Sequence, residues 1–504
     1  MRSSSAIKNF IWDIAFYTAT IILGFFAPRM ILLYYGSEVN GLSATITQIL
    51  NIMLLLQAGA STAAVFSLYK PVAENNYQEI GEKLSAAENF FKRIAFLFLI
   101  IMLAGAVVTA FIVTSGISPF LIFLSFVLLG FRSFLDLLFT AKFRIMFTAD
   151  QRKYIISIAS LIEQTIYYSL LFLTIYLRLT FIWMFVWYFA GCIVKIAYLK
   201  SCFAKYYKDK IPKKKNTTLS KIPGRNYSLA NEVSHSAVAA SPSVIMMILY
   251  GEFIQASIFN VYTLVSSSLA LIGNALYSSF APGFGNLIAS GDQKNINRVF
   301  CFFQYIFTMF NTLLYMCTMY LLVPFVTLYT SSVDDADYIN ASLAVLIVVY
   351  SMVSVYRIPY NIAVSTFGFF RETWAQPVVT AVVSIALSFA LGAIDYTLII
   401  TGLIVFYAAN FIYQHYKIKR LVPYLQTEKM YKHLAISAAG IFAAYLASVY
   451  FPIETPSVVN WLTAAAAAML LSALYILITT LLFEREFLSD LRAYFLRTVF
   501  RREI

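Results

Sequence analysis

The sequence predicts an all-α polytopic membrane protein, with about fourteen transmembrane helices in two parallel-repeat six-helix bundles plus two C-terminal helices. Three observations predict this class: the composition, the number of long apolar segments and an internal repeat. Of the 504 residues, 61% are hydrophobic and 12% are charged, whereas a soluble protein carries roughly 25% charged residues. So few charges cannot cover a globular core with a polar surface. This excludes a soluble enzyme, a disordered chain and a repeat solenoid.

The apolar segments are long enough to cross a bilayer. A spanning helix needs about 20 mostly apolar residues. Fourteen such segments lie near residues 10–34, 41–69, 89–114, 118–146, 153–177, 180–203, 228–250, 256–287, 299–328, 339–364, 373–392, 396–419, 430–451 and 459–483. The first is too long for a secretory signal peptide, and no small-x-small cleavage site follows it before the next span.

The loops between these segments alternate in charge, and this alternation predicts the orientation. One set holds Glu38, Glu252, Asp334, Asp335, Asp337, Asp395 and Glu454, with Arg178 as its exception. The other set, with both termini, holds Lys70, Lys83, Arg152, Lys153, Lys294, Arg298, Arg371, Lys417, Lys419, Arg420 and Lys429. We therefore expect both termini to be cytoplasmic. The net charge of +13 then reflects topology, and the expected partners are membrane lipids rather than nucleic acid.

The basic stretch 204–227 is the predicted cytoplasmic linker between the two halves. We interpret it as a solvated loop that helps to set topology, with contact to anionic lipid as the alternative. The predicted domains are therefore a bundle at 1–203, the linker, a second bundle at 228–420 and two additional helices at 421–483. In the tail 484–504, arginines alternate with apolar residues at helical spacing, which predicts an amphipathic helix on the cytoplasmic membrane surface.

Two stretches about 211–215 residues apart share one pattern. Tyr35-Gly36 ends the first span, and Tyr250-Gly251 ends the seventh. Phe90-Phe91 begins the third span, and Phe302-Phe303 begins the ninth. Because the copies are an even number of spans apart, they have the same orientation. A parallel repeat predicts two halves related by an axis along the membrane normal, with a substrate site between them.

Motifs for covalent or metal chemistry are missing from the sequence. It contains no Walker-type loop and no His-Glu-x-x-His or Gly-x-Ser-x-Gly motif. Cys192, Cys202, Cys301 and Cys317 have no metal-ligand spacing. Asp334, Asp335 and Asp337 resemble a metal cluster, but an acidic outer loop is the simpler interpretation. We predict no metal and no cofactor.

Three arginines fall at membrane depth, where an ionised side chain is costly and usually faces a bundle interior or a wet cavity. They are Arg29, Arg132 and Arg357. A cavity lined by their guanidinium groups would bind phosphate in a bidentate manner. The alternatives are that Arg132 is neutralised by Asp136 one turn away and that Arg29 reaches the outer interface. Arg357 has no acid at helical spacing on its own helix, which makes it the cleanest candidate.

A second group of ionisable residues suits ion coupling. Asp13, Glu163, Glu232 and His235 lie within predicted spans, and Glu232 and His235 share one helix face. Such a pair could bind and release a proton near neutral pH, so coupling to H⁺ or Na⁺ is one interpretation. A structural role is the other, and we favour it.

Several sequence stretches resemble the polysaccharide repeat-unit flippases of the multidrug/oligosaccharidyl-lipid/polysaccharide exporter superfamily. The resemblance covers most of the first twelve spans. It is carried by Arg29, Tyr34-Tyr35-Gly36-Ser37-Glu38-Val39-Asn40-Gly41-Leu42, Gln57-Ala58-Gly59-Ala60, Ser67-Leu68-Tyr69-Lys70-Pro71, Ala149-Asp150-Gln151-Arg152-Lys153-Tyr154-Ile155, Phe284-Gly285-Asn286-Leu287, Tyr356-Arg357-Ile358-Pro359 and Gly368-Phe369-Phe370-Arg371-Glu372. The chain departs from the family pattern in the seventh span, where Pro242-Ser243-Val244-Ile245-Met246-Met247 replaces a run that often contains an aspartate.

The resemblance implies a flippase in a bacterial inner membrane. Its substrate would be an undecaprenyl-diphosphate-linked oligosaccharide moved from the inner to the outer leaflet by alternating access, and polysaccharide polymerase machinery is the implied protein partner. Arg29 and Arg357 fall on arginines of the family pattern and are expected to hold the diphosphate, with Arg132 as a weaker candidate. Gln48, Asn51 and Asn274 are expected to line the sugar region.

Two other functions stay open at this stage. A drug or small-solute antiporter of the same fold would favour an acidic or apolar cavity, against which the three arginines argue. A membrane glycan polymerase or ligase would need a large outer loop, and the outward loops are about a dozen residues at most. We therefore predict that the protein is not an enzyme.

Overall fold

The computed structural model describes residues 2–57, 60–208, 210–212, 225–453 and 457–484. All the regular structure in these residues is helical, in accord with the predicted fold class. Thirteen helices there are long and apolar enough to cross a membrane, so the chain is a multi-pass membrane protein. The tail 485–504 and most of the predicted linker, 213–224, lie outside the described residues.

The chain divides into two compact units. Unit 1 comprises residues 1–260, 332–336 and 392–396, and unit 2 comprises residues 261–331, 337–391 and 397–504. The helices of unit 1 are α1 (Arg2–Leu54), α2 (Ala60–Ala73), α3 (Tyr77–Ile112), α4 (Pro119–Leu135), α5 (Ala141–Ala149), α6 (Tyr154–Tyr176), α7 (Ile182–Tyr207) and α8 (Arg225–Tyr250). A 3-10 turn, η1 (Leu55–Gln57), follows α1, and a π-helical turn, η2 (Asp136–Thr140), joins α4 to α5. Helix α8 packs against α1 in this unit, whereas the predicted bundle boundary assigns residues 228–250 to the second half.

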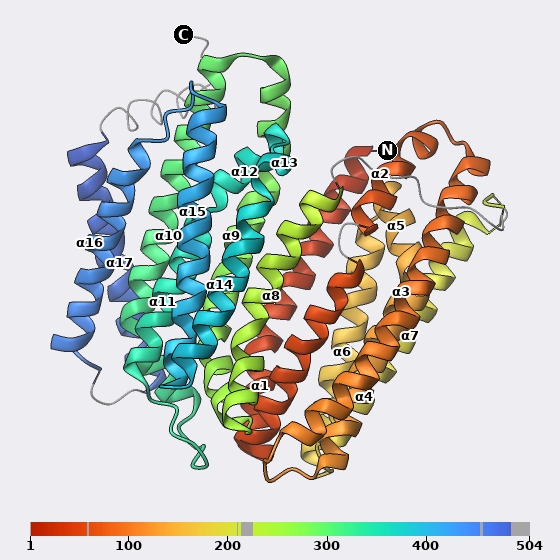
Figure 1. Ribbon diagram of the computed structural model, residues 1–504, viewed down its shortest axis with the longest axis horizontal. Coiled ribbons are helices and arrows are strands. Elements are labelled where there is room, and N and C mark those ends of the chain that lie inside the picture. Colours follow the sequence, from red (N-terminus) through yellow and green to blue (C-terminus); the bar gives the residue numbers. More distant parts are fainter. Residues whose placement is uncertain (1, 58–59, 209, 213–224, 454–456, 485–504) are drawn as a thin grey trace. The chain divides into compact units, whose positions relative to one another are not determined.

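The fourteen predicted spans become thirteen because α1 contains two of them. The membrane-spanning stretch Ile11–Gln57 has 47 residues, and a straight helix of that length would measure about 70 Å, twice the thickness of a bilayer core. The backbone leaves helical geometry at Gly36, with φ 83° and ψ 177°, and Figure 1 shows α1 (red) reversing direction at one end of the unit. The two arms of α1 therefore correspond to the first and second predicted spans.

Asp335 stabilises the change of direction of α1 at Gly36 within unit 1. Its carboxylate accepts hydrogen bonds from the backbone N–H and the hydroxyl of Ser37, both at 2.6 Å. A Cβ atom at Gly36 would lie 2.8 Å from the Asp335 Oδ2 atom. The corresponding residue of the sequence repeat, Gly251, also has a positive φ, 68°. The two copies of the repeat thus both have a glycine with positive φ at their first turn.

Unit 2 contains the remaining helices. They are α9 (Ile254–Ser290) from residue 261 onward, α10 (Gln293–Tyr329), α11 (Ala341–Tyr356), α12 (Ile358–Phe367), α13 (Phe370–Thr373), α14 (Ala375–Gly392), η3 (Tyr396–Leu398), α15 (Ile399–Leu421), α16 (Lys429–Tyr450) and α17 (Val458–Phe483). Side-chain caps fix several starts: Asp292, Asn340 and Ser457 accept hydrogen bonds from backbone N–H groups at the beginning of α10, α11 and α17. The last two helices, α16 and α17, both pack against α10 (Figure 1).

Candidate functional site

Two of the three membrane arginines, Arg132 and Arg357, differ in whether a carboxylate lies beside them. Arg132 lies in unit 1 at the end of α4, and Arg357 lies in unit 2 between α11 and α12. Arg132 is ion-paired, whereas no carboxylate pairs with Arg357 among the residues that the structure describes. The difference decides which arginine is available for an anionic ligand.

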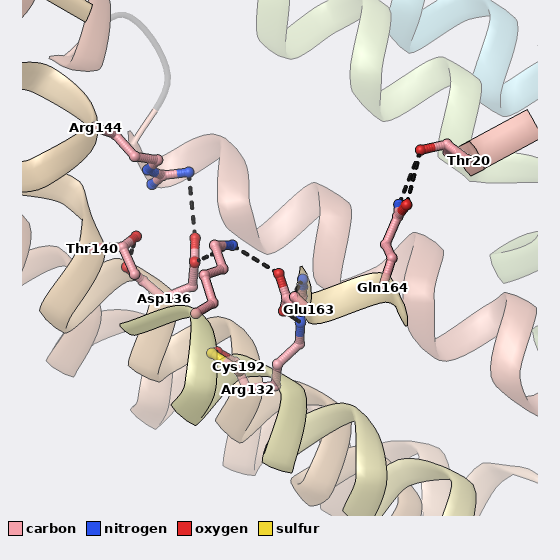
Figure 2. Close-up of polar contacts among 9 residues, drawn as sticks. Thr20, Arg132, Asp136, Thr140, Arg144, Glu163, Gln164 and Cys192 are labelled. Atoms are coloured by element: carbon pink, nitrogen blue, oxygen red, sulfur yellow. Dashed lines mark hydrogen bonds and ion pairs between the residues drawn. The ribbon is translucent and has the colours of Figure 1, made fainter. Parts of the chain in front are cut away.

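Arg132 belongs to a network of five charged side chains (Figure 2). The Arg132 guanidinium lies 2.8 Å from the Glu163 carboxylate on α6, and Lys195 on α7 lies 3.0 Å from the other oxygen of that carboxylate. Lys195 also lies 2.7 Å from Asp136, and Arg144 on α5 lies 3.3 Å from Asp136. Three cations thus share two carboxylates inside one helical bundle.

The pair between Arg132 and Asp136, one of the alternatives considered from the sequence, does not form, and each residue pairs with other helices. Asp136 keeps the α-helical backbone hydrogen bond to the Arg132 carbonyl, but its carboxylate is paired with Lys195 of α7 and Arg144 of α5. Arg132 instead turns to α6 and stacks on the Tyr188 ring of α7, with its guanidinium carbon 4.4 Å from the ring centroid. Gly191 permits the close approach of α7 to α6, since a Cβ atom there would lie 2.9 Å from the Glu163 carbonyl oxygen.

Arg357 lies where the polypeptide passes from α11 to α12. Pro359, at the start of α12, has no N–H to donate, which separates the two helices. The guanidinium carbon lies 5.3 Å from the ring centroid of Tyr407 on α15, and Tyr350 and Tyr277 are its other electrostatic neighbours. The Tyr350 and Tyr407 rings are themselves 5.7 Å apart.

This tyrosine cluster leaves the positive charge of Arg357 without a counterion in the described part of unit 2. The buried Nε–H of Arg357 also has no hydrogen-bond acceptor there. Aromatic ring faces attract a cation but do not neutralise it. The three tyrosines come from three distant parts of the sequence, so the only sequence signal for them was the abundance of tyrosine, 35 residues.

The remaining predicted residues have varied surroundings. Arg29 is half-buried on α1, one residue after Pro28. Asp13 pairs with Lys153 at 2.7 Å and accepts a hydrogen bond from Ser157, which joins α1 to α6. Glu163 belongs to the ion-pair network. These contacts give Asp13 and Glu163 structural roles.

Glu232 and His235 lie one turn apart on α8, with Glu232 exposed and His235 half-buried. In the predicted sugar region, Gln48 is half-buried and Asn51 is exposed on α1. Asn274 is exposed on the part of α9 that belongs to unit 2. The ion-coupling and sugar-binding roles of these residues stay predictions. In the acidic loop, the Asp335 carboxylate accepts a hydrogen bond from the Ser37 N–H, and the Asp337 carboxylate accepts one from the Ile339 N–H at 2.9 Å.

Unit 2 also has an apolar groove between α16, α17 and one side of α10. Its volume is about 400 Å³. Its lining is rich in alanine and contains the following residues: Met316, Tyr320, Ala443, Ala444, Ala447, Phe451, Ala464, Ala467, Ala468, Leu471, Ser472 and Tyr475. Helices α16 and α17 pack mainly on α10 and little on each other, which leaves a groove between them. The small side chains that line the groove do not fill it. A groove of this composition suits a hydrocarbon chain.

Solved structures of transporters share this fold. An inward-facing multidrug resistance transporter of the MATE family, in the MOP superfamily, matches with a TM-score of 0.62 and 11% identity over 80% of this chain and 94% of its own. The lipid II flippase MurJ in an inward closed conformation matches with a TM-score of 0.62 and 15% identity over 95% of this chain and 100% of its own. A MOP-superfamily transporter from Pyrococcus furiosus matches with a TM-score of 0.51 and 10% identity, over 81% and 95% of the two chains.

No protein-family model matches the sequence, and neither does any curated protein. At 10–15% identity the structural matches show the fold alone. The chain therefore has the fold of the MOP-superfamily transporters and flippases.

Proposed function

We propose that the protein is a flippase that moves a polyprenyl-diphosphate-linked oligosaccharide from the inner to the outer leaflet. The observation that carries the proposal is the environment of Arg357, a guanidinium in a tyrosine cluster of a membrane-spanning unit with no carboxylate paired to it in the described residues. An uncompensated charge in such a place is costly. A diphosphate supplies the missing negative charge and accepts bidentate hydrogen bonds.

The substrate is amphipathic, so its parts need different surroundings. The diphosphate and sugars need polar groups, for which Arg357, Arg29 and the predicted sugar-region residues are the candidates. The prenyl chain needs an apolar path, and the alanine-rich groove of α10, α16 and α17 offers one in the same unit as Arg357. Arg132 is not part of the proposed diphosphate site, because Glu163 already neutralises it.

The membrane potential is the proposed energy source, provided that the arginines do not move with the head group. Each elementary charge that crosses is worth about 2.3 kcal/mol per 100 mV. An inside-negative potential therefore favours outward movement of a head group carrying two net negative charges by roughly twice that amount. Glu232 and His235 are the candidates for additional coupling to H⁺ or Na⁺.

The test is a leaflet-resolved flipping assay in proteoliposomes with a fluorescent, quenchable polyprenyl-diphosphate oligosaccharide. Arg357→Ala should slow flipping roughly 10- to 100-fold, which corresponds to the loss of a charge-assisted hydrogen bond. Arg357→Lys should restore the rate in part, because a lysine keeps the charge and loses the bidentate geometry. The matched control is Arg420→Ala, at an exposed arginine in the last turn of α15, which should flip substrate normally.

Normal flipping by a folded Arg357→Ala variant would refute the proposed site. Absence of flipping in the wild type, combined with export of a cationic dye driven by an ion gradient, would favour the antiporter function instead. Formation of glycosidic bonds on the lipid-linked oligosaccharide would favour the polymerase or ligase function.

A further inference from the structure

A second basic site lies in unit 1, separate from the network around Arg132. It is a pocket of about 340 Å³ between α3, α5 and α7. One face of α3 and one face of α7 line it, with α5 at its base. The lining residues are Gly81, Leu84, Ser85, Glu88, Lys142, Phe143, Lys200, Phe203, Ala204, Tyr207, Lys208, Ile211 and Pro212. On α3 and on α7 the lining residues are three or four positions apart, which places them on a single face of each helix.

Contacts between the three walls hold this pocket open. The Lys142 ammonium of α5 lies 3.1 Å from the Glu88 carboxylate of α3. The Phe143 ring of α5 packs on the Phe203 ring of α7, with centroids 5.1 Å apart. At one end, residue 212 crosses α3 so closely that a Cβ atom at Gly81 would lie 2.3 Å from the Pro212 carbonyl oxygen. The pocket is thus a defined part of the bundle.

The charge of the pocket is positive. It contains three lysines, Lys142, Lys200 and Lys208, and one acid, Glu88. Glu88 is already shared between Lys142 and Lys92, at 3.1 Å and 2.9 Å. Lys200 and Lys208 are exposed, and neither forms an ion pair with another residue in the part of the chain that the structure describes. Two ammonium groups are therefore available to an anionic ligand.

The apolar walls of the pocket and its place on the helices favour a lipid. Leu84, Phe143 and Phe203 flank the lysines. Two turns farther along α3 and α7, Phe96 and Ile193 are 56% and 48% exposed, as hydrocarbon-facing residues would be. The pocket also lies at the helix ends that carry the basic loops. By the positive-inside rule these ends face the cytoplasm, where the membrane leaflet is anionic. A phosphate group held by the lysines would leave its acyl chains along these apolar surfaces.

We propose that the pocket formed by Lys142, Lys200 and Lys208 binds the phosphate head group of an anionic membrane phospholipid. This site is independent of the transported substrate. Its occupant is a resident lipid that packs against α3, α5 and α7 at the basic end of unit 1.

Binding of fluorescent phosphatidylglycerol to the full chain in neutral detergent tests the proposal. Lys200→Gln/Lys208→Gln should weaken binding roughly 25-fold, at about fivefold for each lysine near an anionic head group. The matched control is Lys205→Gln/Lys210→Gln, which removes the same charge from the same segment outside the pocket and should change affinity less than about twofold. Lys200→Arg/Lys208→Arg should bind like the wild type, because the site requires charge.

Two comparisons separate a lipid from other occupants. Phosphatidylcholine should bind far more weakly than phosphatidylglycerol, because it has no net negative charge. Glycerol 3-phosphate should not compete at concentrations that match the lipid. Equal binding of the two lipids, an unchanged affinity in the Lys200→Gln/Lys208→Gln variant, or full competition by glycerol 3-phosphate would each overturn the proposal, and the last would assign the pocket to a soluble phosphate.

Discussion

The guanidinium of Arg132 lies 2.8 Å from the carboxylate of Glu163, although the two residues are 31 positions apart and belong to different helices. Lys195 contacts both Glu163 and Asp136 and so joins the two carboxylates into one network. The positive charge that is costly at membrane depth is therefore compensated within unit 1. An arginine in a membrane span indicates a ligand site only where the surrounding helices supply no carboxylate.

Breaking this pair should destabilise the protein. Arg132→Met removes one of the two cations that contact Glu163 in the described residues and leaves Lys195 in place. The Glu163 side chain is 4% exposed, so the loss should cost roughly 1.5–3 kcal/mol, the worth of a hydrogen bond to a charged group. The double substitution Arg132→Met/Glu163→Met should recover part of that loss, because no buried charge is left unpaired at these two positions. Thermal unfolding in detergent measures both effects.

The control for that measurement is Lys153→Met, which breaks the more exposed pair with Asp13. Exposed pairs contribute roughly 1 kcal/mol or less, so its unfolding temperature should change little. If Arg132→Met unfolds like the wild type but fails to flip substrate, Arg132 is a substrate ligand after all.

The turn at Gly36 should tolerate no side chain. Its φ of 83° and ψ of 177° lie in a region that is open essentially to glycine alone, at a cost of roughly 1–3 kcal/mol for other residues. In Gly36→Ala the new Cβ would also meet Asp335 Oδ2 at 2.8 Å, which would disturb the hydrogen bonds to Ser37. We expect a lower unfolding temperature and a smaller yield of folded protein.

Gly24 provides the comparison within the same helix. A Cβ atom there meets nothing within 4 Å, and alanine is a better helix former than glycine by roughly 1 kcal/mol. Gly24→Ala should therefore be neutral or stabilising. Equal losses in the two variants would mean that the positive φ of Gly36 is not the cause.

Glu484, the first residue after α17, should make stability depend on acidic pH. Burial alone would raise the pKa of Glu484, but the hydrogen bonds from Lys432 and His433, at 2.7 Å and 3.2 Å, outweigh it and lower the pKa below its ordinary value. The Glu484 carboxylate therefore binds a proton less tightly in the folded state than in the unfolded state. The stabilisation is fully present above the ordinary glutamate pKa of about 4.3 and is lost as the pH falls through the lower folded-state pKa.

The measurement is the unfolding temperature in detergent between about pH 6 and pH 3. Glu484→Gln should be less stable than the wild type at pH 6, and the two proteins should converge as the pH falls. Glu428→Gln is the control, because that acid and its partner Lys419 are both exposed. A constant difference between wild type and Glu484→Gln across this range would contradict the assignment.

The fold followed from local properties of the sequence. Apolar runs give the spans, and the Tyr-Gly pairs at 35–36 and 250–251 mark the turns where the structure has positive φ at Gly36 and Gly251. The count differs by one because the first arm and the second arm of α1 form a single element around Gly36. Spans and turns can be predicted from length and hydropathy because each of them depends on one continuous stretch of the sequence.

The site residues were less predictable, because their partners lie on other helices. Helical periodicity identifies neighbours on the same helix, and it suggested Asp136 for Arg132. Lys195 and Arg144 take the Asp136 carboxylate, and the approach of α6 and α7 brings Glu163 to Arg132 instead. Arg357 has no acid at helical spacing on its own helix, a feature that the sequence shows directly, but the tyrosines from α9, α11 and α15 are brought together only by packing.

The ring of Tyr407 should contribute to substrate handling through Arg357, if the proposed function is correct. The guanidinium carbon lies 5.3 Å from the ring centroid, within the range of a cation–π interaction worth roughly 0.5–2 kcal/mol. The ring also restricts the direction of the guanidinium, so its loss should misplace the diphosphate ligand. Tyr407→Leu should slow flipping roughly 3- to 30-fold, and Tyr407→Phe should retain most of the activity because it keeps the ring face.

Flipping rates and substrate affinity in proteoliposomes measure the effect, with the unfolding temperature of each variant as the check on folding. Wild-type activity in both Tyr407→Leu and Tyr407→Phe would show that the aromatic face does not position Arg357, and an equal loss in both variants would assign the role to the hydroxyl.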